Sequence, residues 1–417
     1  MLALDMLRGA AGAQPTLDLN FVSGTLDSRV TFTRASSATR VNASGVLEVI
    51  TSGNPRFTYD PVTLSALGLL IEEQRTNLLT YSEAFTDSSW SGRARTVANT
   101  GMSPDGTTNA STLSSDGTSS DTGKIVGVAA TSNAAYTLTC YVEYTNNQWV
   151  LLQLSDVGVA HRARVWFDIQ NGTKGGSAVT GSGVVVDYTI QRAGNGWYRI
   201  SLTATNPITT LYAYFPIIVA GNNSTASAAN GQSVRLWGAQ LEAGAFATSY
   251  IPTTSASVTR AADSATMTGS NFSSWFNATQ GTFVAKFVVP PLVASTYKRV
   301  FSARNVADTE RLEVWVNGAG TVRIGVTTGG TTTETSLVAA VAAGQVCQVA
   351  MAYTSSTQKA SLNGAAVISQ SSSLNGAAFT VLDIGQYDLA NILNSTIDRL
   401  RYYNTALTNA QLQALTT

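Results

Sequence analysis

The side chains best suited to chemistry lie on short segments in which apolar and polar residues alternate. In a strand that packs one face on a core, every second residue points away from that core, so the outward set can be read from the pattern. Between residues 136 and 200 the outward set combines indole and phenol rings with guanidinium, amide and carboxylate groups: Tyr141, Glu143, Trp149, Gln153, Arg164, Trp166, Trp197 and Arg199. Aromatic rings stack on the C–H face of a sugar while polar groups bind its hydroxyls, so we interpret these residues as glycan-binding candidates.

The same residue types also suit contacts between subunits. Trp, Tyr and Arg are the enriched anchors of protein–protein interfaces, and the pattern does not give the order of the strands. The sequence therefore leaves open whether these residues meet sugar or another copy of the chain.

The acidic residues and the single histidine do not form a catalytic pattern. His161 begins a strand-like segment, and the sequence lacks the G-x-S-x-G pattern of a nucleophilic serine. Glu72 and Glu73 are neighbours, and an extended chain points them in opposite directions rather than across a cleft, as glycoside hydrolysis would need. We therefore predict a protein without catalytic residues.

A short phrase with one arginine occurs twice. "TRASSAT" at residues 33–39 aligns, with one gap, with "TRAADSAT" at residues 259–266. Small residues let two chain segments approach closely, and an arginine can bind a carboxylate or several carbonyls. We predict that Arg34 and Arg260 fasten these two segments against neighbouring domains or subunits, through Glu72, Glu73 or Glu242. The alternative is that both segments are solvated linkers.

No cofactor is predicted from the remaining ligand-type residues. Cys140 and Cys347 fall on the apolar side of alternating segments, so each is expected to be a small buried group without a disulfide. Three aspartates near the C-terminus, Asp383, Asp388 and Asp398, could reach a calcium ion at a sandwich rim, but they lack the spacing of a calcium loop. We predict no metal site.

Composition limits the classes of partner. The 417 residues include 25 basic and 25 acidic side chains, and only 12% are charged. This balance argues against nucleic acid as a partner. The N-terminal residues do not resemble a secretory signal, and we find no apolar stretch of membrane-spanning length, so we expect synthesis in the cytoplasm and no membrane insertion.

Alternating segments bounded by Gly, Asn, Ser and Thr predict an all-β protein with two antiparallel jelly-roll sandwiches in tandem. We place a small N-terminal region at residues 1–80, the first sandwich at 81–251, a linker at 252–268 and the second sandwich at 269–417. Thr408 followed by Gln411 is a capping-box pattern, which predicts a short C-terminal helix.

Three stretches resemble bacteriophage head-spike and tail-fibre proteins, including those of phage-like gene transfer agents. They are "RVTFTRASSATRVNASGVLEVI", "PRFTYDPVTLSALGLLIEEQRTNLLTYSEAFTDSSW" and "LWGAQLEAGAFATSYIPTTSASVTRAAD". The region between the last two is similar to the carbohydrate-binding jelly rolls of such fibres. The C-terminal stretch "LDIGQYDLANILNSTIDRLRYYNTALTNAQLQAL" is similar to laminin-G or concanavalin-A-like sandwiches.

The resemblance implies a non-enzymatic fibre or spike on the virion surface that binds host polysaccharide through several weak sites. It implies that residues 1–80, and residues 1 to about 20 above all, attach the protein to other virion proteins at a portal, tail or capsid vertex. It also implies a homo-oligomer, either a trimer or a pentamer. Two alternatives remain: a purely architectural decoration protein, and a depolymerase that acts on capsule.

Overall fold

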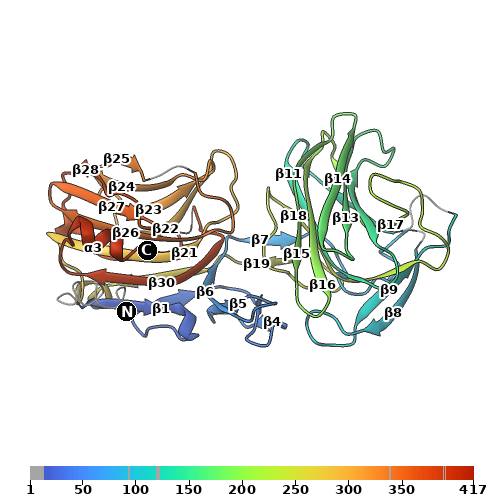
Figure 1. Cartoon of the computed structure of the whole chain (residues 1–417), viewed down its shortest axis with the longest axis horizontal. Coiled ribbons are helices and arrows are strands. Elements are labelled where there is room, and N and C mark those ends of the chain that lie inside the picture. Colours follow the sequence, from blue (N-terminus) through green and yellow to red (C-terminus); the bar gives the residue numbers. More distant parts are fainter. Residues whose placement is uncertain (1–13, 93, 119–122, 338–339, 388, 390) are drawn as a thin grey trace.

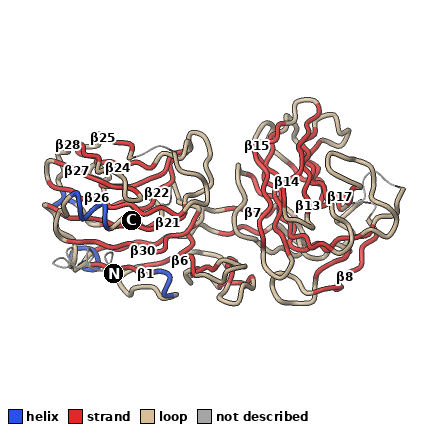
Figure 2. The backbone as a smooth tube through the Cα atoms, viewed as in Figure 1, coloured by secondary structure: helices blue, strands red, loops and turns tan. Residues whose placement is uncertain are grey.

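Two β-sandwiches lie side by side in the computed structural model of the chain (Figure 1). The structure describes residues 14–417 except 93, 119–122, 338–339, 388 and 390. Strands dominate this part of the chain, and helices are short (Figure 2). The prediction of an all-β fold with two antiparallel sandwiches and a short C-terminal helix is confirmed.

Two antiparallel sheets form the middle sandwich. Among the described residues, five strands make the first sheet, in the order β10 (Lys124–Ala129), β17 (Thr210–Val219), β12 (Trp149–Ser155), β13 (Arg162–Asp168) and β14 (Thr173–Thr180). Six strands of the described chain make the second sheet, in the order β15 (Val184–Arg192), β16 (Trp197–Thr205), β11 (Ala135–Tyr144), β18 (Ser233–Ala243), β9 (Ala110–Ser114) and β8 (Arg95–Gly101).

The core of this sandwich lies between the two sheets and follows the alternation of the sequence. Val150, Leu152 and Leu154 point inward from β12, and Cys140 does so from β11; all four are fully buried. Burying apolar surface of this kind contributes about 25 cal/mol per Å² to stability. The predicted inward position of Cys140 is confirmed.

The C-terminal sandwich also has two antiparallel sheets. In the described residues the larger sheet runs β28 (Ile368–Ser371), β27 (Thr357–Leu362), β26 (Val346–Thr354), β21 (Gln280–Val288), β30 (Ser395–Tyr403), β6 (Ala66–Ile71) and β5 (Arg56–Tyr59), with β1 (Leu17–Asn20) also paired to β30. The other sheet runs β2 (Thr31–Thr33), β20 (Ser264–Thr268), β29 (Val381–Ile384), β22 (Tyr297–Arg304), β23 (Arg311–Asn317), β24 (Val322–Thr328) and β25 (Thr331–Ser336).

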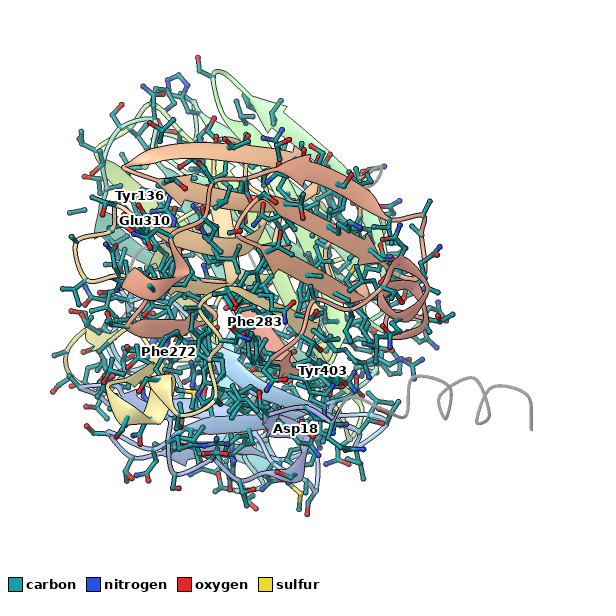
Figure 3. The ribbon with its side chains drawn as sticks, turned by 90° about the vertical axis from the view of Figure 1, so that its left-hand side faces the viewer. Asp18, Tyr136, Phe272, Phe283, Glu310 and Tyr403 are labelled. Carbon is teal, nitrogen blue, oxygen red and sulfur yellow. The ribbon has the colours of Figure 1, made fainter. Side chains whose placement is uncertain are left out.

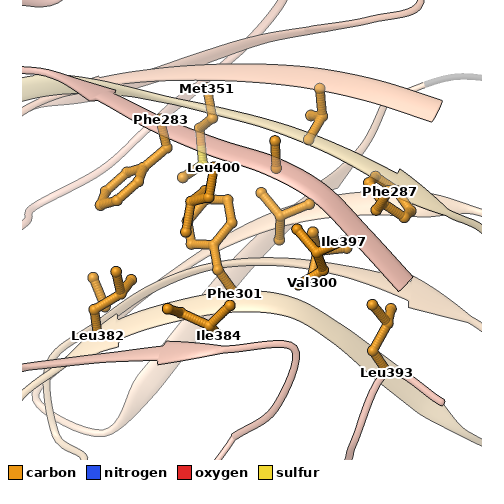
Figure 4. Packing of buried hydrophobic residues seen from close by; sticks show 14 of the residues in the cluster. Phe283, Phe287, Val300, Phe301, Met351, Leu382, Ile384, Leu393, Ile397 and Leu400 are labelled. Carbon is orange, nitrogen blue, oxygen red and sulfur yellow. The ribbon is translucent and has the colours of Figure 1, made fainter. Parts of the chain in front are cut away.

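Aromatic and aliphatic side chains fill the space between these two sheets (Figure 4). Phe283 of the larger sheet packs on Phe301 of the other, with ring centroids 4.7 Å apart. Cys347 belongs to the same core and is a free, buried cysteine, as predicted. Helix α3 (Asn409–Ala414) packs on the outside of the larger sheet, and Thr408 with Gln411 forms the predicted capping box.

The N-terminal residues are part of the C-terminal sandwich. Strands β1, β5 and β6 extend its larger sheet, and β2 extends the other, whereas the sequence suggested a separate region at residues 1–80. Asp18 of β1 lies beside β30 (Figure 3), where it forms an ion pair with Arg399. Residues 1–13 of the predicted docking segment lie outside the described residues, and its attachment role remains a prediction.

The expected linker at residues 252–268 contains two strands. β19 (Val258–Arg260) pairs with β7 (Arg75–Asn77), and both lie between the sandwiches in Figure 1. β20 pairs with β2, which places Thr33 of the first phrase opposite Ser264 of the second. Small side chains permit this pairing, and the two repeated phrases are therefore neighbours in space.

Five short elements complete the description. A hairpin of β3 (Ala38–Val41) and β4 (Leu47–Ile50) follows the first phrase. The remaining helical turns are η1 (Phe21–Ser23), α2 (Ser270–Ser273) and η2 (Gly376–Ala378). No helix among the described residues is both long and apolar enough to cross a membrane.

Candidate functional site

The eight glycan-binding candidates divide between two sheets. Tyr141, Glu143, Trp197 and Arg199 belong to β11 and β16 of the six-stranded sheet, and Trp149, Gln153, Arg164 and Trp166 belong to β12 and β13 of the five-stranded sheet. Each set lies on the side of its sheet that faces away from the core between them. The predicted side of each strand is correct. The order of the strands, which the sequence left open, places the eight residues in two separate groups.

The aromatic residues on the six-stranded sheet are covered by the chain itself. Tyr141 is 6% exposed and Trp197 is 3% exposed, because Leu47 of the β3–β4 hairpin and the ring of Tyr250 pack over them. The Trp197 indole donates to the carbonyl of Met102 at 3.1 Å. The expectation that these two rings face solvent is therefore wrong. Alternation identified the side of the sheet, but it does not show what covers that side.

The two charged candidates on the same sheet differ in their surroundings. Glu143 forms an ion pair with Arg235 at 2.6 Å. Arg199 donates to the Thr139 hydroxyl at 3.2 Å, and its guanidinium carbon lies 5.6 Å from the centre of the Tyr141 ring. Arg199 also lines a cleft of about 720 Å³ between the two sandwiches, opposite Pro291 and Leu292. Glu143 is thus satisfied within the chain, and Arg199 faces the other sandwich.

The four candidates on the five-stranded sheet are close together. Gln153 pairs directly with Arg164 across the strands, and Leu151 pairs with Trp166. Gln153 also faces Tyr214 of β17 on its other side. Neighbouring positions on one face of an antiparallel pair have Cβ atoms about 5 Å apart, so this row forms one continuous surface.

Two of these four side chains are buried rather than exposed. Trp166 is 1% exposed because its indole donates to the carbonyl of Ser224 at 2.8 Å and the loop that follows β17 lies over it. That loop approaches β14 at Gly175, where a Cβ would come within 3 Å of Asn222, Trp149 and Trp166. Gln153 is 4% exposed, whereas Trp149 and Arg164 are half-buried.

Three further residues complete this surface, and they are not among the eight candidates predicted from the sequence. Arg162 lies two residues before Arg164 on the same side of β13, and Tyr212 and Tyr214 lie on the same side of β17. The alternation of "LYAYF" could have identified both tyrosines. We call the set Gln153, Arg162, Arg164, Tyr212 and Tyr214 the arginine face; Trp149 lies at one end of it.

The arginines of this face have no acidic partner in the described part of the chain. Neither Arg162 nor Arg164 forms an ion pair with any described residue, and the Nε atom of each is buried without a hydrogen-bond partner there. Burial, and then the positive charge of Arg162, lowers the pKa of Arg164. The guanidinium carbon of Arg164 lies 5.7 Å from the centre of the Trp166 ring, which gives a modest cation–π attraction. Among the described residues, the positive charge of this face therefore has no acidic partner.

The two arginines of the repeated phrase meet at a buried carboxylate where the chain passes between the sandwiches. Arg34 donates to Asp263 at 3.0 Å, and Arg260 lies 4.0 Å from the other oxygen of the same carboxylate. Arg56 forms ion pairs with Asp263 and, at 2.7 Å, with Glu72. The five side chains Arg34, Arg56, Glu72, Arg260 and Asp263 form the buried ionic cluster.

The predicted partners of Arg34 and Arg260 are partly present. Glu72 lies 3.7 Å from Arg260, and the backbone carbonyl of Glu73 accepts from Arg260 at 2.7 Å. The Glu73 carboxylate binds other cations, namely Arg75 at 2.6 Å and Lys298 at 3.1 Å. The Glu242 carboxylate accepts instead from the backbone N–H and the hydroxyl of Thr248. Among the described residues it forms no ion pair with Arg34 or Arg260.

Asp263 and Arg56 were not identified from the sequence, although the alignment of the two phrases gave a signal for Asp263. Asp263 is the extra residue of the second phrase, at the gap in the alignment, and its carboxylate also accepts from the backbone N–H of Glu72 at 2.9 Å. Burial opposes the ionisation of Glu72, but Arg260 and Arg56 outweigh it and hold the pKa of Glu72 well below its usual range. The contacts lie within one chain and join segments far apart in sequence.

The residues considered for metal binding and catalysis have other contacts. Asp383 pairs with Arg304 at 2.6 Å and Asp398 with Lys286 at 2.8 Å, while Asp388 lies outside the described residues. Within the described part of the chain, no group of three or more His, Cys, Asp or Glu side chains could hold a metal ion. The ring of His161 accepts from the backbone N–H of Ser182 at 3.0 Å.

One part of the chain matches a known family. Residues 260–413 match the model of the concanavalin A-like lectin/glucanases superfamily, a laminin-G type. This match confirms the predicted class of the C-terminal sandwich. It does not extend to the middle sandwich or to the strands at residues 17–71. No curated protein sequence matches the chain significantly.

Several solved structures resemble part of the chain. The CBM40 module of the Ruminococcus gnavus IT-sialidase is 18% identical over 34% of this chain and 84% of its own, with a TM-score of 0.31. A heptameric SAP-like pentraxin from Limulus polyphemus is 16% identical over 32% of this chain and 68% of its own, with a TM-score of 0.25. Botulinum neurotoxin type C, whose cell entry depends on two ganglioside molecules, is 9% identical over 37% of this chain and 40% of its own, with a TM-score of 0.29. At these scores the likenesses carry no functional argument.

Proposed function

We propose that the chain is a non-catalytic, lectin-like component of a virion fibre or spike, and that it binds host surface polysaccharide through the arginine face and Trp149. The observation that carries this proposal is the composition of that surface. A half-buried indole, the half-buried ring of Tyr212 and two half-buried arginines that form no ion pair with a described residue lie together on one sheet, beside the buried side chains of Gln153 and Tyr214. Rings supply a stacking surface for a sugar, and the polar groups bind its hydroxyls.

The contacts of Glu72 and Glu73 support a binding role rather than catalysis. The adjacent carboxylates of Glu72 and Glu73 are held by cations and hydrogen bonds among the described residues. A carboxylate fixed in this way stabilises the fold instead of donating a proton to a substrate.

The proposed setting is the surface of a phage or phage-like particle, which the sequence resemblance suggests. Several copies on one particle would raise the effective concentration of a weak sugar site, because a second contact forms within an already tethered complex. A trimeric or pentameric assembly attached to other virion proteins would supply this multivalency.

The test is the replacement Trp149→Ala, assayed on an array of bacterial surface polysaccharides with the full chain. Loss of a stacked ring should weaken binding by roughly tenfold, since such contacts are worth about 1 kcal/mol or somewhat more. Tyr297→Ala is the matched control, because Tyr297 is 47% exposed on the other sandwich. Unchanged binding by Trp149→Ala, or an equal loss with Tyr297→Ala, would contradict the proposal and favour a purely architectural protein.

A further inference from the structure

We infer that the arginine face selects negatively charged glycans, and that its ligand carries a carboxylate on the sugar, as a uronic acid does. This inference rests on the proposed function, because it names the class of glycan that the same surface takes. Three features of the structure lead to it: the pairing of arginines elsewhere, the spacing of Arg162 and Arg164, and the aromatic floor beside them.

Three other partly buried arginines of the described chain have an acidic partner on a neighbouring strand. Arg235 pairs with Glu143, Arg299 with Glu313, and Arg304 with Asp383, each at 2.6 Å. A charge removed from water without a partner is costly, so this pairing is the usual solution. Arg162 and Arg164 form no ion pair among the described residues, which they share with Arg199, but only these two lie side by side on one strand.

The acids nearest to these arginines in the sequence serve the adjoining turns. Asp156, just after β12, accepts from the backbone N–H of His161 at 2.9 Å. Asp168, at the end of β13, accepts from the side chains of Gln148 and Asn171, each at 2.8 Å. Neither carboxylate is paired with Arg162 or Arg164, so an anionic ligand would meet no competing carboxylate of the described chain there.

The spacing of the two arginines fits one anion between them. Residues i and i+2 of a strand point to the same side and lie about 7 Å apart along it. Each guanidinium can bind a carboxylate through two parallel N–H groups, and an anion placed between the two also relieves their mutual repulsion. Burial and that repulsion both lower the pKa of Arg164, and a bound carboxylate would reverse the second effect.

The surroundings favour a sugar as the carrier of this carboxylate. The Tyr212 ring lies across Gly127, where a Cβ would come within 3.1 Å of it, so the ring is held flat against the sheet. Tyr214 and Gln153 lie in the next row toward Trp149. Tyr214 and Gln153 are buried, so a pyranose ring would stack on Tyr212, and its carboxylate substituent would then lie toward Arg162 and Arg164.

The test uses the full chain with labelled arginine and two small probes. The acidic probe is the methyl glycoside of galacturonic acid, with its carboxylate free, and the neutral probe is methyl galactoside. We expect the acidic probe to shift the Nε–Hε resonances of Arg162 and Arg164 at a concentration roughly tenfold lower than the neutral probe requires. This difference corresponds to one charge-assisted contact. Arg162→Gln with Arg164→Gln should remove this preference, so that the acidic and the neutral probe bind this variant with equal affinity. Arg95→Gln, an exposed arginine on β8 of the other sheet, is the control and should retain the preference.

Equal affinity for the two probes, or no response of these resonances to either, would overturn the inference. A phosphorylated mannose probe that binds more tightly than the acidic galactoside would overturn the assignment to a carboxylate. The proposed function fails separately, if Trp149→Ala leaves binding to surface polysaccharides unchanged.

Discussion

Replacement of Asp263 by asparagine tests whether the buried ionic cluster holds the C-terminal sandwich together. Asp263 is completely buried, and its carboxylate accepts from Arg34, Arg56 and the backbone N–H of Glu72. Asparagine preserves the size of the side chain but removes its charge. Glu72 would then be the only carboxylate of the cluster facing three buried arginines.

Removing one partner of a buried ion pair costs about 3–5 kcal/mol, because the remaining charge stays out of water without compensation. For a domain of this size, 1 kcal/mol corresponds to roughly 2–4 °C in Tm, so we expect Tm to fall by roughly 6–20 °C. The assay is calorimetry of the full chain at neutral pH, following the transition of the C-terminal sandwich.

Asp398→Asn provides the matched control in the same sandwich. Asp398 pairs with Lys286 at 2.8 Å, but both side chains are partly exposed, so this change should cost at most about 1 kcal/mol. In the Asp263→Asn background, Arg34→Gln should cost less than it does in the wild type, because it removes an arginine that has already lost its partner. Equal Tm values for Asp263→Asn and Asp398→Asn would refute the reasoning.

Three further predictions concern the same sandwich. The folded state holds the pKa of Glu72 below its usual 4.5, so the ionised Glu72 contributes to stability above that pH, and this contribution is lost as the pH falls below it. Glu72→Gln should therefore flatten the acid side of the curve of unfolding free energy against pH. An unchanged curve would contradict this prediction. In urea unfolding, Gly68→Ala should lower the unfolding free energy by roughly 1–3 kcal/mol more than Gly53→Ala does. Both glycines have positive φ, but only at Gly68 would a Cβ lie 2.1 Å from a backbone carbonyl oxygen. Equal losses for the two variants would count against this prediction. A fragment of residues 258–417 should aggregate or unfold because it lacks β1, β2, β5 and β6, whereas a monomeric fragment with the Tm of the full chain would disprove the need for those strands.

Local alternation predicted those features that depend on one strand and its core. It placed Cys140 and Cys347 inward, and it assigned the candidates on β12 and β13 to the correct side. The capping box at Thr408 was equally local, since its two side chains lie three residues apart. A prediction of this kind succeeds because the period of a strand or the first turn of a helix is set by the backbone itself.

Exposure of the outer faces could not be predicted in the same way. The rings of Tyr141 and Trp197 lie on the expected side of their strands, yet the β3–β4 hairpin covers them from a position about a hundred residues earlier in the chain. Trp166 is covered by a loop after β17. A pattern within one strand carries no information about such coverage, which depends on the packing of distant segments.

Long-range pairing also explains why the N-terminal strands and Asp263 were missed. β1 pairs with β30, near the other end of the chain, and nothing in "LDLN" specifies that partner. The repeated phrase did signal a special role for Arg34 and Arg260. Their shared partner became evident only when the pairing of β2 with β20 brought the two phrases together.

The most direct test of the central claim is hydrogen exchange of the full chain with and without a bacterial surface polysaccharide that it binds on the array. The account predicts that backbone amides of β12, β13 and β17 become protected, while those of β11 and β16 on the opposite sheet are unchanged. Protection confined to β15 and β16, or to the C-terminal sandwich, would show that the arginine face is not the glycan-binding surface.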